Sequence, residues 1–352
     1  MTAPDTGPPD VSLRQFLMRL SVDPMALAEF LHDPLSVIKR SALDEPGRTA
    51  LIHAYELQMW ELLLHRPVTP WPEAHGAANG QAASPERGSL TVVGTGIRTL
   101  GQLTAEAIAW IKVSDVVLYA VADPVAEEVI RTLNPAGALS LLGYYVEGMA
   151  RRLAYDRMVQ HIVSCVKAGQ RTCVALYGHP GISAYPAHEA IRRLRKEGFQ
   201  ARMLPGISAE DCLFADLGVD PARTGCQSIE ASHFLLSEKT IDTTSALILW
   251  QVGAVGDNTY HSLRYNLGDA FPLMISKLSD VYGGSHVATV YEAAILPGMA
   301  PRIKPVAIES LTPDDVTAGS TLYIPPSKRR VFNRELASRL GFYRGGRKEV
   351  RP

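Results

Sequence analysis

The sequence has few cysteines, almost no net charge and no long apolar run, and each shortage excludes a class of protein. Its four cysteines include no Cys-x-x-Cys pair, which argues against a disulfide framework or a metal site and suits a cytoplasmic protein. A net charge of −1 provides no basic field for nucleic acid. No run of about 18 apolar residues occurs, so we expect no membrane partner. The first residues resemble no signal peptide, so we expect no export.

The chain divides into segments with different residue patterns. Residues 11–64 are typical of a small helical domain, because apolar residues between positions 13 and 20 recur at helical spacing. Asp23 and Asp33 each precede a proline, and Asp44 begins a similar helix entry. Helices this short make a small core, so the segment is either a bundle that only docks on its neighbour or a functional module.

The rest of the chain predicts an α/β protein. Residues 65–88 are rich in proline and glycine, which favours a flexible linker. Over residues 89–226 apolar strands alternate with helices, which predicts a parallel sheet covered on both faces. Within it we expect a long helix over Glu147–Ala168. Residues 227–326 predict a second α/β domain with more antiparallel pairing, and 327–352 a helix and a basic tail.

The stretch "YGHPG", Tyr177–Gly181, ends a predicted strand where parallel α/β sheets collect ligands. Its glycines permit positive φ and a close approach of ligand to backbone. His179 alone is as well explained as a buried histidine with its hydrogen bonds satisfied. Gly94-Thr95-Gly96 also ends a strand, but Thr99 replaces the third glycine of a dinucleotide fingerprint, which favours a plain tight turn. Similar turns follow at Asp123, Gly206 and Gln251.

The stretch "GYYVEGMARRLAY" gathers tyrosine and arginine. Arg151 and Tyr155 are four residues apart and share one helix face, with Tyr144 and Tyr145 just before the helix. One interpretation is aromatic packing beneath an arginine. The other is a cluster in which the guanidinium lowers a tyrosine pKa, giving a base for a weakly acidic proton.

Taken together, these stretches resemble the tetrapyrrole methylase superfamily, and within it the borosin peptide-backbone α-N-methyltransferases. The resemblance covers about residues 89–340. It implies two α/β domains that hold S-adenosyl-L-methionine in the cleft between them, and a homodimer. The residues that carry it are "SLTVVGTGI", "YYVEGMARRLAY", "ALYGHPG", "GFQARMLPGISAEDCLFADLGVDP", "IEASHFLL", "LWQVGAVG" and "STLYIPP".

The resemblance also implies residue roles. The catalytic cluster falls on Tyr145, Arg151, Tyr155 and Tyr177. The cofactor contacts fall on Tyr177, His179, Ile182, Ser208, Ala209, Gln251, Ser320 and Thr321. A peptide amide nitrogen is a poor nucleophile because its lone pair is delocalised into the carbonyl. Methylation therefore needs the amide proton removed, by Tyr145 or Tyr155, with Arg151 stabilising the negative charge and Tyr177 orienting the amide.

The N-terminal segment is similar to the borosin-binding domain of borosin precursors, although here it precedes the methyltransferase. Residues 65–88 and the basic tail do not resemble a hydrophobic core peptide. We therefore expect a separate precursor peptide as substrate. The helical segment is then a relic, a dimer-stabilising element or an occupant of the precursor's docking surface. The alternatives are a tetrapyrrole or precorrin C-methyltransferase, a self-methylating precursor fusion, and a peptide-binding module without catalysis.

Overall fold

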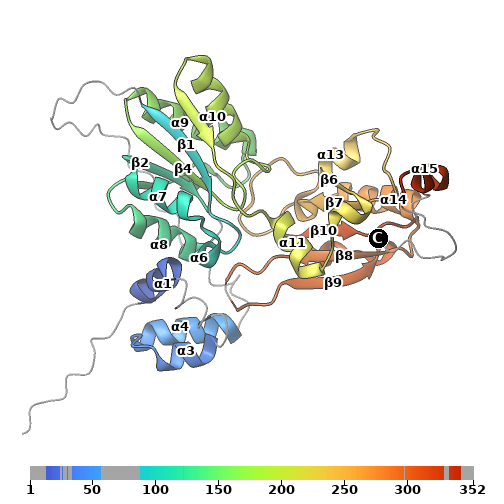
Figure 1. The fold of residues 1–352 in the computed structure, drawn as a ribbon, viewed down its shortest axis with the longest axis horizontal. Coiled ribbons are helices and arrows are strands. Elements are labelled where there is room, and N and C mark those ends of the chain that lie inside the picture. The colour runs from blue at the N-terminus through green and yellow to red at the C-terminus, as the bar shows by residue number, and fades with distance from the viewer. Residues whose placement is uncertain are drawn as a thin grey trace, which may run out of the picture. The chain divides into compact units, whose positions relative to one another are not determined.

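In a computed structural model, the described residues form two compact units, each built on a five-stranded sheet (Figure 1). The structure describes residues 13–23, 26, 30, 34–56, 88–121, 123–296, 298–328 and 333–341. Within these, no helix combines the length and the apolar character that crossing a membrane requires. The first unit holds the chain up to Cys212 with Asn258–Leu263 and Ala293–Ala300, and the second holds Leu213–Asp257, Arg264–Glu292 and the chain from Pro301.

Of three short helices near the N-terminus, the last two begin directly after a predicted entry residue, Asp33 and Asp44. The Asp44 carboxylate accepts a hydrogen bond from the backbone N–H of Gly47 at 2.9 Å, and so satisfies a backbone donor that the first turn of a helix leaves without a partner. The Asp23 carboxylate, just after the first helix, accepts one from the N–H of Ala26 at 3.1 Å. The helices are α1 (Leu13–Val22), α3 (Pro34–Arg40) and α4 (Glu45–Glu56).

The apolar face of α1 is buried against the first unit. Phe16, Leu17 and Leu20 share one core with Val129 and other residues of α8 (Pro124–Leu133), and α1 also packs on α6 (Thr99–Gln102) (Figure 1). Burial of this face stabilises a segment whose own core is small. The predicted continuation of the last helix over 57–64, the predicted linker up to residue 87 and the basic tail from 342 lie outside the described residues.

The first sheet is parallel throughout, as the sequence predicts. Its order is β3-β2-β4-β1-β5. The three-residue edge strand β3 was not predicted, because its side chains alternate only between half-buried and exposed positions. The strands are β1 (Ser89–Gly94), β2 (Val116–Ala120), β3 (Ala138–Ser140), β4 (Arg171–Leu176) and β5 (Gln200–Met203).

Helices cover both faces of this sheet, which explains the continuous apolar strands. Alternate residues of β2 point to opposite faces: Val117 joins the core beneath α8, and Leu118 joins a second core with Ile162 and Leu194. The helices that contribute to the two cores include α7 (Ala105–Val113), α9 (Arg151–Lys167) and α10 (Tyr185–Lys196).

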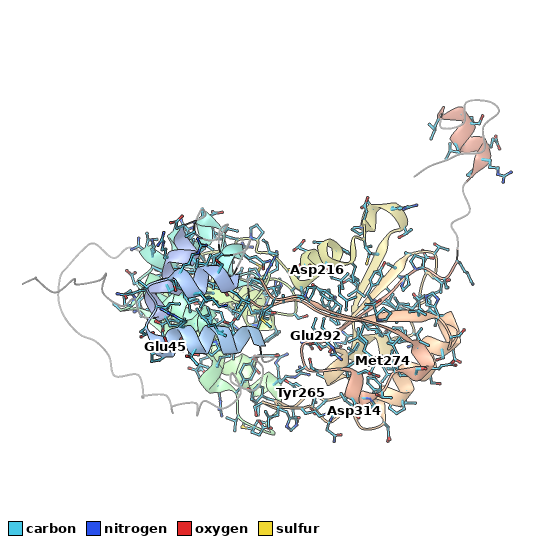
Figure 2. The ribbon with its side chains drawn as sticks, turned by 90° about the horizontal axis from the view of Figure 1, so that it is seen from below. Glu45, Asp216, Tyr265, Met274, Glu292 and Asp314 are labelled. Carbon is cyan, nitrogen blue, oxygen red and sulfur yellow. The ribbon has the colours of Figure 1, made fainter. Side chains whose placement is uncertain are left out.

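The second sheet is mixed, with order β6-β7-β10-β8-β9. Only β6 and β7 pair in parallel; the other neighbours are antiparallel. Met274 of α14 (Ala270–Tyr282) lies in its core (Figure 2). The sequence did not predict β6 or α13 (Ala231–Leu236), because this stretch is short and lacks a clear apolar period. The strands are β6 (Cys226–Glu230), β7 (Ala246–Trp250), β8 (Val287–Glu292), β9 (Arg302–Ala307) and β10 (Thr321–Ile324).

The remaining helices join or follow these sheets. They are α11 (Ala209–Leu217), α12 (Pro221–Thr224), α13 (Ala231–Leu236), α14 (Ala270–Tyr282) and α15 (Arg334–Arg339), with single 3-10 turns at Leu142–Tyr144, Val252–Ala254, Ile308–Ser310 and Pro313–Asp315.

Three loops meet at the carboxyl edge of the first sheet with no room for side chains. A Cβ on Gly94 would lie 2.3 Å from the carbonyl oxygen of Gly178 and 3.0 Å from the Cα of Gly206. Gly96 and Gly178 exchange backbone hydrogen bonds at 3.4 and 3.0 Å, and both have positive φ. The Gly-x-Gly turn after β1 is therefore a tight turn that pairs with the "YGHPG" loop, which agrees with the plainer interpretation of its sequence.

A prediction concerns Tyr282 in the second unit. Its hydroxyl is buried, and no hydrogen-bond partner for it occurs among the described residues. Replacing a buried hydroxyl that lacks a partner removes a desolvation cost of about 1–3 kcal/mol. We therefore expect Tyr282→Phe to raise the free energy of unfolding by about 1 kcal/mol, measured by urea denaturation. A less stable variant would show that the hydroxyl has a partner.

The same variant tests a pH dependence. Burial, with smaller contributions from Asp242 and Cys226, raises the pKa of Tyr282 to about 12. The unfolded chain releases this proton near the ordinary pKa of 10.0. The folded state thus binds more protons above pH 10, and stability falls as pH rises towards 12. Tyr282→Phe should lack this fall in the free energy of unfolding with pH. The free energies of unfolding of the wild type and the variant should therefore differ more at pH 11 than at pH 8.

Candidate functional site

The predicted tyrosine–arginine cluster lies in the first unit, at the start of α9. Arg151 is the first residue of this helix and Tyr155 follows one turn later; both are half-buried. Tyr145 lies before the helix, with its ring perpendicular to that of Tyr155 (82°) and 6.2 Å from it between centroids. The structure thus brings these three predicted catalytic residues to one place.

The helix begins at Arg151, and the prediction of a start at Glu147 is wrong. Residues 148–151 instead form a short antiparallel ladder with residues 258–260. Gly148 donates its N–H to the Tyr260 carbonyl at 2.8 Å, and Tyr260 donates to the Met149 carbonyl at 2.8 Å. The Gly148 N–H and the Met149 carbonyl are paired in this way and cannot also form the hydrogen bonds of a helix.

Two further tyrosines join the cluster, and sequence reasoning missed both. The Tyr260 ring stacks on Tyr145 with 4.6 Å between centroids and 20° between planes. Tyr185, at the start of α10, lies 6.2 Å from Tyr155, and its hydroxyl accepts a hydrogen bond from Arg152 at 2.7 Å. Neither tyrosine lies in a sequence motif that would mark it as part of a site. Tyr260 follows the last strand before it by ten residues, and no local signal could have found it.

Tyr144 does not belong to the cluster. Its hydroxyl lies 2.9 Å from Nδ1 of His161, two turns further along α9 than Tyr155. Burial raises the pKa of Tyr144 above 10.0, opposite to the lowering expected for a tyrosine beside an arginine. The structure therefore separates the neighbouring tyrosines: Tyr145 faces the cluster and Tyr144 packs on α9.

Tyr177 stands at the end of β4, where its N–H donates to the Ala120 carbonyl at 3.0 Å. Its ring is partly uncovered, with 37% of the residue exposed. Desolvation by the surrounding protein, followed by the negative charges of Asp123 and Cys212, raises the pKa of Tyr177 well above 10.0. At neutral pH the phenol keeps its proton and can donate a hydrogen bond.

The loop after β4 presents a fixed histidine and an uncovered apolar side chain. Nδ1 of His179 accepts a hydrogen bond from the Gly181 N–H at 3.0 Å, so in the neutral imidazole the proton is on Nε2. Ile182, two residues after Pro180, is 42% exposed. Both side chains lie in the loop that the parallel sheet places at its carboxyl edge, the usual position of ligands.

Ser208 and Ala209 follow β5 at the start of α11. Ser208 is buried, and both its hydroxyl and its N–H donate to the Asp211 carboxylate at 2.7 Å. Asp211 in turn donates its N–H to the Ser208 hydroxyl at 3.2 Å. This reciprocal capping box commits the serine side chain to the helix.

The other predicted cofactor residues belong to the second unit. Gln251 follows β7 in the left-handed region (φ 57°), which is costly for a residue with a side chain and common at functional positions. Ser320 donates its hydroxyl to the Glu292 carboxylate at 2.5 Å, and Thr321 begins β10. Ser320 and Thr321 are buried.

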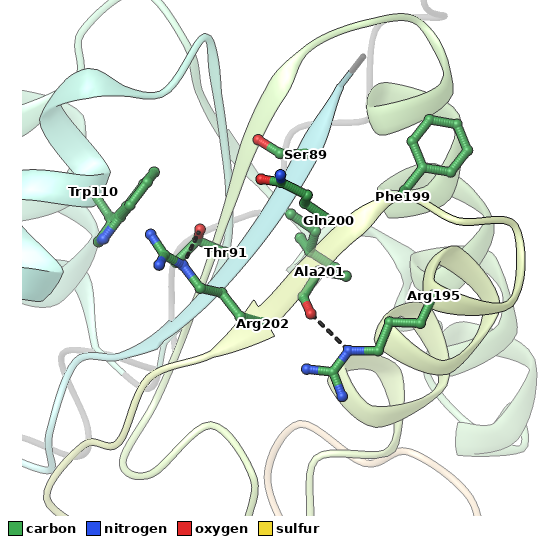
Figure 3. A pocket seen from close by; sticks show the side chains of 9 residues that line it. Ser89, Thr91, Trp110, Arg195, Phe199, Gln200, Ala201 and Arg202 are labelled. Carbon is green, nitrogen blue, oxygen red and sulfur yellow. Dashed lines mark hydrogen bonds between the residues drawn. The ribbon is translucent and has the colours of Figure 1, made fainter.

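A cavity of about 420 Å³ lies elsewhere, at the amino ends of β1 and β5 (Figure 3). The Arg202 guanidinium stacks over the Trp110 ring at 4.3 Å, and Arg195 donates to the Ala201 carbonyl at 2.7 Å. β5 is an edge strand of the sheet. Arginines beside an edge strand discourage pairing with another chain, so we interpret this hollow as edge protection. It contains none of the predicted site residues.

The chain is similar over most of its length to fungal proteins. It is 39% identical over 264 residues to the methyltransferase/ribosomally synthesized cyclic peptide dendrothelin A precursor of Dendrothele bispora, which covers 74% of this chain and 63% of that protein. It is 38% identical over 257 residues to the corresponding omphalotin A precursor of Omphalotus olearius, covering 72% and 61%. The chain thus spans less than two thirds of the length of these relatives.

Solved structures share the fold. The uroporphyrin-III-C-methyltransferase of Thermus thermophilus superposes with a TM-score of 0.50 at 16% identity, covering 72% of this chain and 96% of that one. At 16% sequence identity, this similarity shows a shared fold only. The family model described as Tetrapyrrole (Corrin/Porphyrin) Methylases matches residues 89–295, more than half of the chain, and the protein therefore belongs to the tetrapyrrole methylase family.

Proposed function

We propose that this protein is an S-adenosylmethionine-dependent methyltransferase that methylates backbone amide nitrogens of a ribosomally made precursor peptide. The observation that carries the proposal is the juxtaposition of Tyr145 and Tyr155 beside Arg151 at the start of α9. Relatives whose names combine a methyltransferase with a cyclic peptide precursor support a peptide substrate.

The loop after β4 fits S-adenosylmethionine. Tyr177 and Ile182 leave large apolar side chains uncovered at the carboxyl edge of the sheet, and a ligand with an aromatic base would cover such surface. His179 offers its Nε2–H as a donor. Because the Ser208 side chain is committed to α11, its contact and that of Ala209 would come from the backbone. The proposed contacts of the second unit are Gln251, Ser320 and Thr321.

When bound, the cofactor supplies a methyl group on a sulfonium, and the protein must prepare the nucleophile. An amide nitrogen becomes nucleophilic once its proton leaves. We assign the base to Tyr145 or Tyr155, and to Arg151 the stabilisation of negative charge on the phenolate or on the amide oxygen. Because its pKa is raised, Tyr177 keeps its proton. It can therefore orient the amide by donating a hydrogen bond to the carbonyl oxygen.

The second candidate is C-methylation of a tetrapyrrole such as a precorrin, which the family description suggests. A porphyrinoid substrate does not need a tyrosine–arginine base, whereas an amide N–H does. The packing of four tyrosines around the start of α9 therefore favours the peptide.

The first prediction from the proposed function is cofactor binding. We expect S-adenosylhomocysteine, the product form, to bind the purified chain with one site in isothermal titration calorimetry. His179→Ala should weaken binding, because it removes the donor and the support of the Gly181 turn, and Ile182→Ala should weaken it less. An absence of heat at ligand concentrations near the solubility limit would refute the cofactor assignment.

The second prediction separates chemistry from binding. Loss of a general base typically lowers the rate about 10²–10⁴-fold, and we expect this for Tyr155→Phe or Tyr145→Phe, with S-adenosylhomocysteine affinity unchanged. Tyr144→Phe is the matched control, because its hydroxyl faces His161 instead of the cluster. If all three variants methylate at the wild-type rate, the base is wrongly assigned.

The third prediction concerns the substrate and the assembly. We propose action on a separate peptide by a homodimer, with the N-terminal helices as a module that supports the first unit. Co-expression with candidate precursor peptides should add mass in steps of one methylene unit to the peptide, and light scattering should give twice the chain mass. Methyl groups found on this chain's own residues would show self-methylation instead, and a monomer that methylates at full rate would exclude the dimer as the active form.

A further inference from the structure

Helix α9 has no side-chain cap of its own. Its N-cap residue is Ala150, which makes no side-chain hydrogen bond to the first turn. The Arg151 N–H instead donates to the Asn258 carbonyl at 2.9 Å. The first turn of a helix needs partners for its free N–H groups, and here a segment more than a hundred residues downstream supplies one. We call residues 258–262 the strap.

Side chains fasten the strap to the turn before α9. The Glu147 carboxylate lies 2.8 Å from Nδ1 of His261 and accepts the Ser262 N–H at 2.9 Å. On the other side of the imidazole, Nε2 lies 2.8 Å from the Thr259 hydroxyl. Both ring nitrogens thus have partners, so the ring is held in one orientation. These hydrogen bonds lower the pKa of Glu147, which keeps its carboxylate ionised.

The strap places one ring against the cluster. The backbone of Tyr260 is paired in both directions with residues 148 and 149, and its ring covers one face of Tyr145. The edge-to-face contact with Tyr155 holds Tyr145 from another direction. Tyr145 ends the 3-10 turn before the helix, where its N–H donates to the Leu142 carbonyl at 3.0 Å. This bond holds the backbone, and the contacts with Tyr260 and Tyr155 hold the ring.

We propose that Tyr260 is a positioning residue that orients Tyr145 by ring stacking, and that the Glu147–His261 contact is the clamp that holds it there. The inference rests on the proposed function, because it assigns the strap a role in amide methylation. It predicts that the ring of Tyr260 matters and its hydroxyl does not.

The test compares Tyr260→Leu, which removes the ring, with Tyr260→Phe, which keeps it. Misplacement of a reacting group by about 1 Å can cost about 100-fold in rate. We expect kcat of Tyr260→Leu to fall about 10–100-fold, with KM for the peptide and affinity for S-adenosylhomocysteine within about twofold, and Tyr260→Phe to behave as the wild type. Leu263→Ala, at a position in the same loop that is 66% exposed, is the matched control and should change nothing.

A second variant tests the clamp without touching the rings. Glu147→Ala should lower kcat less than Tyr260→Leu does, and the double variant should be no slower than Tyr260→Leu, because both changes act through one device. If the losses in kcat add up in the double variant, the Glu147–His261 contact does not act as the clamp on Tyr260. Equal losses in Tyr260→Phe and Tyr260→Leu, or an unchanged kcat in Tyr260→Leu, would overturn the positioning role.

Hydrogen exchange separates this inference from the proposed function, since it needs no substrate. Amides of residues 148–155 should exchange faster in Glu147→Ala and Tyr260→Leu than in the wild type and the Leu263→Ala control. Faster exchange in these two variants, combined with a wild-type chain that methylates no peptide, would support the strap and reject the proposed function. Unchanged exchange in both variants would reject the strap, whatever the activity of the wild type.

Discussion

The close approach of Gly94, Gly178 and Gly206 is the constraint on which the carboxyl edge of the first sheet depends. Because backbone meets backbone there, three loops that follow three different strands are held at van der Waals distance. In the loop after β4, Tyr177 and Ile182 are partly uncovered, and Nδ1 of His179 accepts a hydrogen bond from the Gly181 N–H. A Cβ on Gly94 or Gly206 would push the segments apart, and a side chain on Gly178 would be strained by its positive φ, so the packing of this edge also sets the position of the loop.

The positions of Arg151 and Tyr155 depend on how α9 is held. This helix packs its inner face into the sheet through Ile162 and its neighbours, while its first turn carries Arg151 and Tyr155. The core fixes the helix axis, but the strap fixes where the helix starts. Because residues 258–262 return to the first unit after β7, the unit that holds the tyrosine cluster is not continuous in sequence. A fragment that ends before residue 258 would lose both the helix cap and Tyr260.

These dependences explain what the sequence could predict. Strands β1, β2 and β4 are largely apolar runs bounded by glycine or polar residues, so the local pattern was enough to place them. Arg151 and Tyr155 were grouped correctly, since four residues on a helix is a local relation. The start of α9 was misplaced because Glu147 and its neighbours are paired with the distant strap, and no local propensity records such a partner. Tyr260 and Tyr185 were not predicted to join the cluster for the same reason. The predicted domain limits and residue roles remain predictions.

Tyr177 and the tyrosines at the start of α9 have different proposed roles. Tyr177 is desolvated and lies near the Asp123 carboxylate, so ionising its phenol is costly and it is suited to donating a hydrogen bond. The proposed base is Tyr145 or Tyr155, which lie at the start of α9 with Arg151. A base and a separate hydrogen-bond donor are what the proposed amide substrate needs, because a peptide bond carries an N–H and a carbonyl oxygen on one planar group. Methylation of a macrocycle carbon does not need this pair of groups, so the tyrosines favour the proposed peptide substrate.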